Sequence, residues 1–300
     1  MGPYAGETVS ILVSVCWTIS AVCYEDVSKR IGSVNLNVLR LVLTIVMVGC
    51  ITTVMTGSAV PVGATSEQWL WLSLSGLVGL FVGDLCLFKS YALIGARMSQ
   101  LLMTLSPVFT SVIALVVFGE VLTVREAIAI VTVLAGIVIA ISGRGRGLRL
   151  ESAGKNAVAG GIVLSAAGAL CQATGYVLTK KGLGDLNIFA ATQIRAFTAI
   201  ACFALLVTLR GRWSSVGWAV RRRTALGPLV VGTVIGPVLG ISLSLWAVAN
   251  ATTGIAATLM ALVPIFILVP TWWRGKERIT KQQVAGAFIS VGGAALLFVG

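Results

Sequence analysis

Asp84 is the first candidate for chemistry in this 300-residue chain, because it lies deep inside an apolar segment predicted over residues 69–91. An ionisable group within a membrane span is energetically costly and is by default a functional hypothesis. A carboxylate that faces a cavity could pair with a substrate amine or take up a coupling proton. The alternative is a charge at a helix end, paired with Lys89 or Arg97, and the sequence leaves both interpretations open.

Two arginines, Arg40 and Arg195, lie inside apolar segments at related places in the two halves of the chain. A long arginine stem can carry its guanidinium from within a span to the membrane surface. The symmetric placement raises a second interpretation, in which both side chains face a central cavity. There each would balance an acidic group or an anionic substrate.

Two polar stripes within apolar segments follow helical spacing. Gln172 and Tyr176 are four residues apart, and Trp17, Ser20 and Tyr24 are separated by three and four residues. Residues at these spacings share one face of a helix, and a polar face inside a membrane must contact protein or water. Each stripe lines either the cavity or a helix–helix contact. We expect the cavity for Gln172 and Tyr176 and leave both options open for the first-span stripe.

The elements that must position these residues are transmembrane helices. The chain is 57% hydrophobic and 11% charged, with a mean hydropathy of +1.00, whereas soluble proteins carry about 25% charged residues. A helix crosses the bilayer with roughly 17–25 residues. The predicted fold is an all-α integral membrane protein with ten transmembrane helices. The predicted spans are residues 8–27, 36–56, 69–91, 98–118, 124–142, 157–178, 187–209, 226–248, 254–273 and 282–299.

The composition also excludes several kinds of function. The chain has no histidine, and its six cysteines show no C-x-x-C spacing, so neither metal ligands nor histidine-based catalysis is expected. Walker-A, G-x-S-x-G and Rossmann motifs are missing. We therefore predict no enzyme activity, no cofactor and no metal. The net charge of +12 is distributed over short loops, where basic residues set membrane topology, so nucleic acid is not an expected partner.

A repeat with an offset of 157 residues organises the chain. The pairs that recur at this offset are Pro107 and Pro264, Glu120 and Glu277, Thr123 and Thr280, and Gly136 and Gly293. They divide the chain into a five-helix repeat over 1–142, a polar linker over 143–156 and a second five-helix repeat over 157–300. An odd number of spans per repeat forces opposite orientations. This is the inverted-repeat plan of secondary transporters, whose substrate site lies near the membrane midplane.

The repeated prolines and glutamates are predicted to be structural. Proline removes a backbone hydrogen bond and kinks a helix, so Pro107 and Pro264 could also act as gating joints or free carbonyl groups beside the cavity. Glu120 and Glu277 lie in the turn of each repeat, where a carboxylate can satisfy the N–H groups of a helix start.

Basic residues predict the orientation in the membrane. Three of them, Arg125, Lys180 and Lys181, lie on the face reached after the even-numbered spans. Sixteen lie on the other face: Lys29, Arg30, Arg97, Arg144, Arg146, Arg149, Lys155, Arg210, Arg212, Arg221, Arg222, Arg223, Arg274, Lys276, Arg278 and Lys281. Because basic loops stay in the cytoplasm, both termini are predicted to lie outside it.

The repeated unit resembles the EamA-like domain, which occurs twice in ten-helix members of the drug/metabolite transporter superfamily. The segment SPVFTSVIALVVFGEVLT matches its proline-containing helix and Gly-Glu-x-x-Thr turn closely, and VPIFILVPTWWRGKERIT matches it less well. The resemblance implies an inverted-repeat bundle whose central cavity is lined chiefly by helices 1, 3, 4, 6, 8 and 9. It also implies cytoplasmic termini, against the basic-residue count, and we follow the count.

Together these features predict a secondary transporter in the cell (inner) membrane that exports amino acids or related small polar metabolites by alternating access. Asp84 is the leading residue for substrate or proton coupling, and Arg40, Arg195, Gln172, Tyr176, Trp17 and Tyr24 are further cavity candidates. A flippase for lipids or lipid-linked substrates has the same architecture and remains an alternative. The expected partners are a small-molecule substrate, the lipid bilayer, a coupling proton or exchanged solute, and a second copy of the chain in a homodimer.

Overall fold

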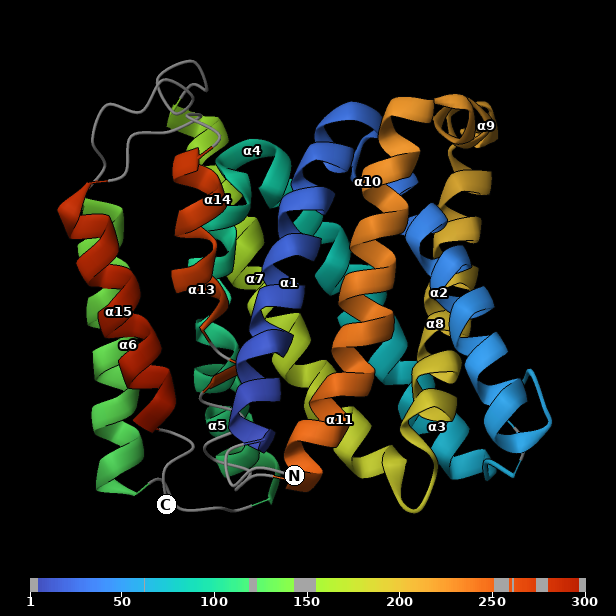
Figure 1. The fold of residues 1–300 in the computed structure, drawn as a ribbon, viewed down its shortest axis with the longest axis horizontal. Helices are drawn as coiled ribbons and strands as arrows, with labels where there is room; N and C mark the ends of the chain where they lie inside the picture. Colours follow the sequence, from blue (N-terminus) through green and yellow to red (C-terminus); the bar gives the residue numbers. More distant parts are fainter. Residues whose placement is uncertain are drawn as a thin grey trace.

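The computed structural model of the protein describes residues 5–61, 63–118, 123–142, 155–250, 259–260, 262–273 and 280–296. Within these ranges every regular element is a helix, and strands are absent. The all-helical fold class is therefore confirmed. The helices stand side by side in a bundle, and most of their axes run in one direction or its reverse (Figure 1).

Each of the ten predicted spans overlaps a helix in the described part of the chain, and residues 254–258 of the ninth span lie outside that part. The first half contributes α1 (Ala5–Ile31), α2 (Ser33–Thr56), α3 (Ser66–Ser75), η1 (Gly76–Gly83), α4 (Asp84–Leu102), α5 (Leu105–Phe118) and α6 (Val124–Ser142). The second half contributes α7 (Lys155–Leu183), α8 (Ile188–Leu209), α9 (Trp213–Arg221), α10 (Arg223–Thr233), η2 (Val234–Gly240), α11 (Ile241–Asn250), α13 (Val263–Phe266), α14 (Leu268–Trp273) and α15 (Lys281–Leu296).

The two halves have opposite orientations. In Figure 1, α1 begins at the lower end of the bundle and α7 begins at the upper end, so these corresponding helices are antiparallel. The helix α15 ends at the lower end, where α1 begins, as an even number of spans requires. The predicted inverted arrangement of the two repeats is therefore confirmed.

Two π-helical segments interrupt the third and eighth spans. The segment η1 covers Gly76–Gly83 and η2 covers Val234–Gly240. Adding the repeat offset of 157 to the residue numbers of η1 gives 233–240, so the two segments lie at equivalent positions. Gly79 and Gly83 map onto Gly236 and Gly240. Because π-helical turns are rare and are often found at functional sites, their recurrence in both repeats marks the region around them.

The chain departs from a straight helix twice, once just before the fourth span and once within it. At Gly95 the backbone has φ 81° and ψ 158°, which a residue with a side chain adopts with strain, and the chain turns there from the third span into the fourth. Further on, helix α4 ends at Leu102 and α5 begins at Leu105. Pro107 has no N–H to donate to the Met103 carbonyl, which accepts a bond from the Ser106 N–H at 2.9 Å instead.

The second repeat has a similar interruption, because a turn at Leu262 precedes the short helix that contains Pro264. The helix breaks expected near both prolines are therefore present. Their proposed role in gating stays a prediction. Glu120 and Glu277 lie outside the described residues.

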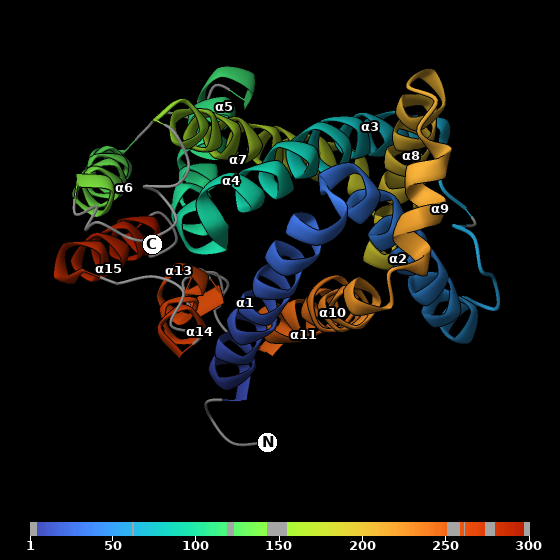
Figure 2. The ribbon, with the colours of Figure 1, turned by 90° about the horizontal axis from the view of Figure 1, so that it is seen from above.

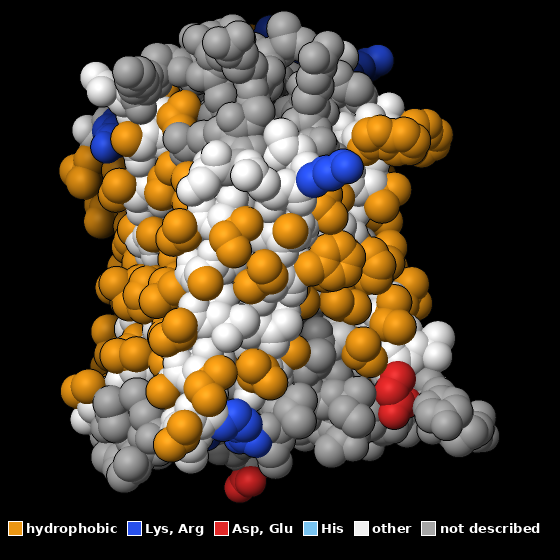
Figure 3. All heavy atoms as spheres, turned by 90° about the vertical axis from the view of Figure 1, so that its left-hand side faces the viewer, with side chains coloured by type: hydrophobic (Ala, Val, Ile, Leu, Met, Phe, Trp, Pro, Cys, Tyr) orange, Lys and Arg blue, Asp and Glu red, His pale blue; other side chains and the backbone are white. Residues whose placement is uncertain are grey.

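The outside of the bundle fits a lipid environment. Figure 3 shows one side of the molecule, where hydrophobic side chains cover the middle and charged ones lie toward the two ends. Individual apolar side chains are as exposed as Val116 at 77% and Trp273 at 85%. Six described helices are long and apolar enough to cross a membrane: Ala5–Ile31, Ser33–Thr56, Ser66–Leu102, Asn156–Leu183, Ile188–Leu209 and Arg223–Gly240.

The short helix α9 lies across one end of the bundle instead of along it (Figures 1 and 2). Its Trp213 and Trp218 rings are about half exposed, and the Arg222 guanidinium lies 4.8 Å from the centre of the Trp218 ring. Tryptophan and arginine favour the headgroup layer of a membrane. This helix therefore marks the membrane surface at the basic end of the bundle.

Candidate functional site

A buried ion pair joins Asp84 to Arg40. The Asp84 Oδ2 atom lies 2.5 Å from Arg40 Nη2, and the two residues are only 4% and 7% exposed. Asp84 is the first residue of α4, directly after the π-helix η1, and Arg40 lies on α2. A buried charge requires a partner, and here Asp84 finds it on another helix. The partners considered from sequence, Lys89 and Arg97, do not pair with Asp84.

Two amides add further polar contacts to this pair, in which Arg40 Nε is buried without a hydrogen-bond partner. Gln172 on α7 donates from Nε2 to Asp84 Oδ1 at 3.1 Å, so both carboxylate oxygens accept hydrogen bonds. On the other side, Asn37 Oδ1 accepts a bond from Arg40 Nη2 at 3.3 Å, and Asn37 Nδ2 is itself bound to the Ser33 carbonyl. Helices from both repeats therefore meet at one carboxylate.

Aromatic rings cover the Arg40 guanidinium. Its central carbon lies 5.1 Å from the centre of the Phe88 ring and 5.9 Å from that of Tyr24, within range of cation–π attraction. The two rings are 5.2 Å apart. The Tyr24 hydroxyl also forms a hydrogen bond with Thr233 Oγ1 at 3.1 Å, which connects the ion pair to the end of α10.

Arg195 lies near this pair but is held differently. Its terminal Nη2 lies 3.3 Å from the place that a Cβ atom on Gly79 would occupy, so the side chain follows η1. Its Nε atom is buried without a hydrogen-bond partner. Arg195 interacts electrostatically with Asp84. The sequence suggested equivalent roles for Arg40 and Arg195, whereas the structure gives the carboxylate to Arg40 alone.

The stripe on α1 forms a helix–helix contact with the eighth span. A Cβ atom on Gly236 would come within 2.7 Å of Ser20 Cβ, and one on Gly240 would come within 3.3 Å of the Trp17 ring. Ser20 Oγ also donates to the Gly232 carbonyl at 2.9 Å. Of the two options left open for this stripe, packing is the one that the contacts describe.

The other π-helix packs against glycines of α7. A Cβ atom on Gly175 would lie 3.1 Å from the Cα atom of Gly79, which is tighter than ordinary side-chain packing. Ser75 Oγ donates to the Gly175 carbonyl at 2.7 Å and bonds to Thr179 Oγ1 at the same distance. Small residues let helix backbones approach closely in a membrane. This close approach is what brings Gln172 within reach of Asp84.

Several residues of the site were not singled out in the sequence. Asn37 lies three residues before Arg40, a spacing that puts the two on one helix face, and that spacing could have revealed it. Phe88 has no distinguishing sequence signal in so apolar a segment. The glycines at 79 and 83 could have been found, because they recur at 236 and 240 with the offset of the repeat.

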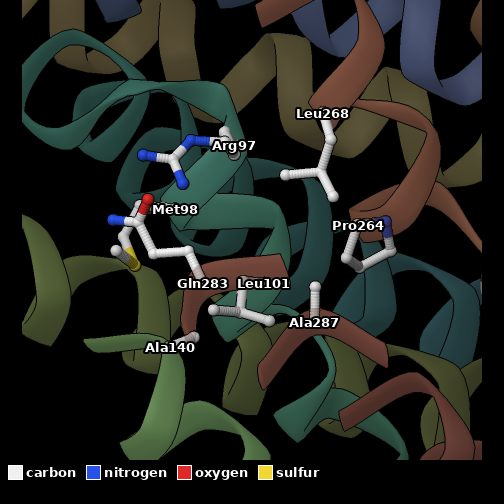
Figure 4. A pocket seen from close by; sticks show the side chains of 8 residues that line it. All are labelled: Arg97, Met98, Leu101, Ala140, Pro264, Leu268, Gln283 and Ala287. Atoms are coloured by element: carbon white, nitrogen blue, oxygen red, sulfur yellow. The ribbon is translucent and has the colours of Figure 1, made fainter. Parts of the chain in front are cut away.

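Two cavities lie away from the ion pair. One, of about 220 Å³, lies between the start of α2 and the end of α8, and its basic lining includes Arg210 and Arg212. The other, of about 10 Å³, has room for roughly one water molecule; Figure 4 shows Arg97, Pro264 and Gln283 around it. Neither cavity is lined by Asp84 or Arg40, so the pair is enclosed by protein in this conformation.

The sequence matches the EamA-like transporter family over residues 5–142 and again over 159–299. The chain belongs to this family. The two matched regions are the two repeats of a membrane transporter built from a pair of EamA-like units. A search among proteins with curated descriptions finds no significant match.

A solved structure has a similar fold. It is described only as the crystal structure of a protein, is 18% identical in sequence and superposes with a TM-score of 0.63. The comparison covers 97% of this chain and 96% of the other. At this identity the similarity concerns the fold, and it extends over essentially the whole EamA-like chain.

Proposed function

We propose that this EamA-like transporter is a secondary exporter of amino acids or related small polar metabolites that works by alternating access. The observation that carries the proposal is the buried Asp84–Arg40 pair with its Gln172 contact. It joins α2 and α4 of the first repeat to α7 of the second. An intramembrane ion pair that is hydrogen-bonded to the other inverted repeat is a feature expected of a transport site.

The ion pair supplies a way to couple solute movement to a change of shape. Asp84 can exchange Arg40 for another cationic partner, namely a proton or the amine of a substrate. Once that exchange occurs, the contacts that hold α2 to α4 and α7 weaken, because each depends on the carboxylate charge. The interrupted helices near Pro107 and Pro264 then provide joints about which the halves rock.

Flux in proteoliposomes tests this function. Vesicles containing the purified protein and loaded with a mixture of amino acids and small organic acids should release at least one solute faster than protein-free vesicles. Fluorescent phospholipids in the same vesicles report the alternative, movement of lipid between leaflets. Lipid movement without solute release would contradict the exporter assignment and favour a flippase.

We also propose that both termini lie outside the cytoplasm. The end of α1, whose last turn contains Lys29 and Arg30, and the helix α9 lie at the upper end of the bundle in Figure 1, opposite to the start of α1 and the end of α15. The positive-inside rule places such a basic end in the cytoplasm. A reporter fused after Gly300 that is active only outside the cytoplasm tests this, and activity of a cytoplasm-specific reporter would reverse the orientation.

A further inference from the structure

Arg195 has no anionic partner of its own among the described residues, although it lies beside the buried ion pair. We propose that Arg195 binds the carboxylate of the transported solute. This inference rests on the proposed transport function and adds a substrate class to it. The expected ligands are amino acids or other metabolites that carry one negatively charged carboxylate.

The balance of charge around Asp84 favours a ligand that places a carboxylate at Arg195. The group holds one carboxylate and two guanidinium groups, and Arg40 already neutralises Asp84 at 2.5 Å. The charge of Arg195 therefore remains uncompensated within a membrane-spanning segment, which is unfavourable at low dielectric constant. A single carboxylate neutralises it. A phosphate ester, with a charge of about −1.5 to −2, would leave an excess of negative charge.

The geometry of Arg195 is that of a prepared binding group. The backbone of Arg195 packs against Gly76, where an added Cβ atom would lie 2.8 Å from the Arg195 Cα atom. From there the side chain passes the empty side of Gly79, and its Nε remains without a hydrogen-bond partner. The Nε–H and a terminal N–H of a guanidinium form the fork that binds a carboxylate through two parallel hydrogen bonds.

Arg195 is also the more accessible of the two arginines. Arg40 is 7% exposed, contacts Asp84 and Asn37, and lies under the Phe88 ring. Arg195 is partly exposed. Arg195 is not held by the Asp84–Arg40 pair, so a carboxylate bound at its guanidinium leaves that pair intact.

Binding measurements with matched ligands test the proposal. Thermal unfolding of the purified protein would be followed with the twenty amino acids, their carboxamides, lactate, pyruvate and inorganic phosphate. We expect at least one carboxylate ligand to stabilise the wild-type protein. The carboxamide of the same ligand, if it belongs to the panel, should have no effect. In Arg195→Gln the apparent affinity should fall at least about tenfold, since a charged hydrogen-bonded contact is lost. Arg195→Lys should fall less, because it keeps the charge and loses only the fork.

Arg223→Gln, on the exposed basic end, is the matched control and should behave as wild type. The assignment would be overturned if a carboxylate and its carboxamide stabilised the protein equally, or if Arg195→Gln had unchanged affinity. Stabilisation by phosphate alone, or by no member of the panel, would overturn it too. If Arg195→Gln does not fold, two measurements test the proposal instead: the comparison of a carboxylate with its carboxamide on the wild-type protein, and the affinity of Arg195→Lys. Flux of a neutral or cationic solute that survives Arg195→Gln would reject this inference and retain the transport function; lipid movement without any solute flux would reject both.

Discussion

Two crossings in the bundle have equivalent backbones and different side chains. At the first, which we call the charged crossing, η1 passes α7 and Gly79 approaches Gly175, with Asp84 following directly. At the second, the aromatic crossing, η2 passes α1 and Gly236 meets Ser20 and the Trp17 ring. Both π-helices have glycines at the same repeat positions. The partner helix presents glycine at the charged crossing, and serine and tryptophan at the aromatic crossing.

The difference shows what duplication preserved and what changed afterwards. The position equivalent to Asp84 in the second repeat is Ile241, whereas Arg40 and Arg195 each lie seven residues after the first residue of their helix, α2 or α8. The π-helical backbone, its glycines and an arginine therefore persist in both halves, whereas the carboxylate does not. The charged crossing contains the buried ion pair, whereas the aromatic crossing is a packed helix–helix contact.

The largest expected effect on stability comes from breaking the ion pair. Arg40→Met leaves Asp84 buried without a cation and should lower the free energy of unfolding by about 3–5 kcal/mol. Adding Asp84→Asn should restore much of this loss, because no unpaired charge then remains. The equivalent position in the other half provides a control, since Ile241→Val should change little. Chemical unfolding in detergent gives the free energy of unfolding of the wild type and of the three variants. A double variant no more stable than Arg40→Met would contradict the pairing.

An intermediate effect is expected from crowding the aromatic crossing. In Gly236→Ala the new Cβ atom would meet Ser20 Cβ at 2.7 Å, and such overpacking costs about 1–3 kcal/mol. Ser20→Gly should rescue it by removing the clashing atoms. The matched change Gly79→Ala meets the flexible end of Arg195 at 3.3 Å and should cost less. If Gly79→Ala proved the more damaging of the two, the contrast between the crossings would be wrong.

The smallest expected effect comes from the link between the crossings. Tyr24→Phe removes the hydroxyl that bonds to Thr233 at 3.1 Å and keeps the ring beside Phe88. The loss should be about 0.5–1.5 kcal/mol, the usual net value of one hydrogen bond. Thr233→Ala should add little once the tyrosine hydroxyl is gone. If the double variant lost as much free energy of unfolding as the two single variants together, the hydrogen bond would not contribute to stability.

Much of the architecture could be predicted from the sequence, because the membrane imposes simple rules. Spans must be long and apolar, and polar groups inside them must find protein partners. These rules identify the ten helices, and they single out Asp84, Arg40 and Gln172, which the structure brings together. The repeated prolines and the opposite orientation of the halves follow from the duplication in the same way.

The pairing within the site could not be predicted, because it depends on how separate helices pack. Lys89 and Arg97 are closer to Asp84 along the chain, yet Arg40 is its partner from 44 positions earlier. The α1 stripe likewise could not be assigned until the position of η2 was known. The π-helical turns themselves depend on packing, although their glycines repeat visibly at 79 and 83 and at 236 and 240.

The most direct test of the account is solute flux by Asp84→Asn in proteoliposomes. The substitution keeps the shape of the side chain and removes the charge that holds Arg40 and couples it to the other repeat. We predict normal expression and membrane insertion with transport abolished, while Ile241→Val at the equivalent position transports as wild type. Full transport by Asp84→Asn would remove the ion pair from the mechanism and contradict the central claim.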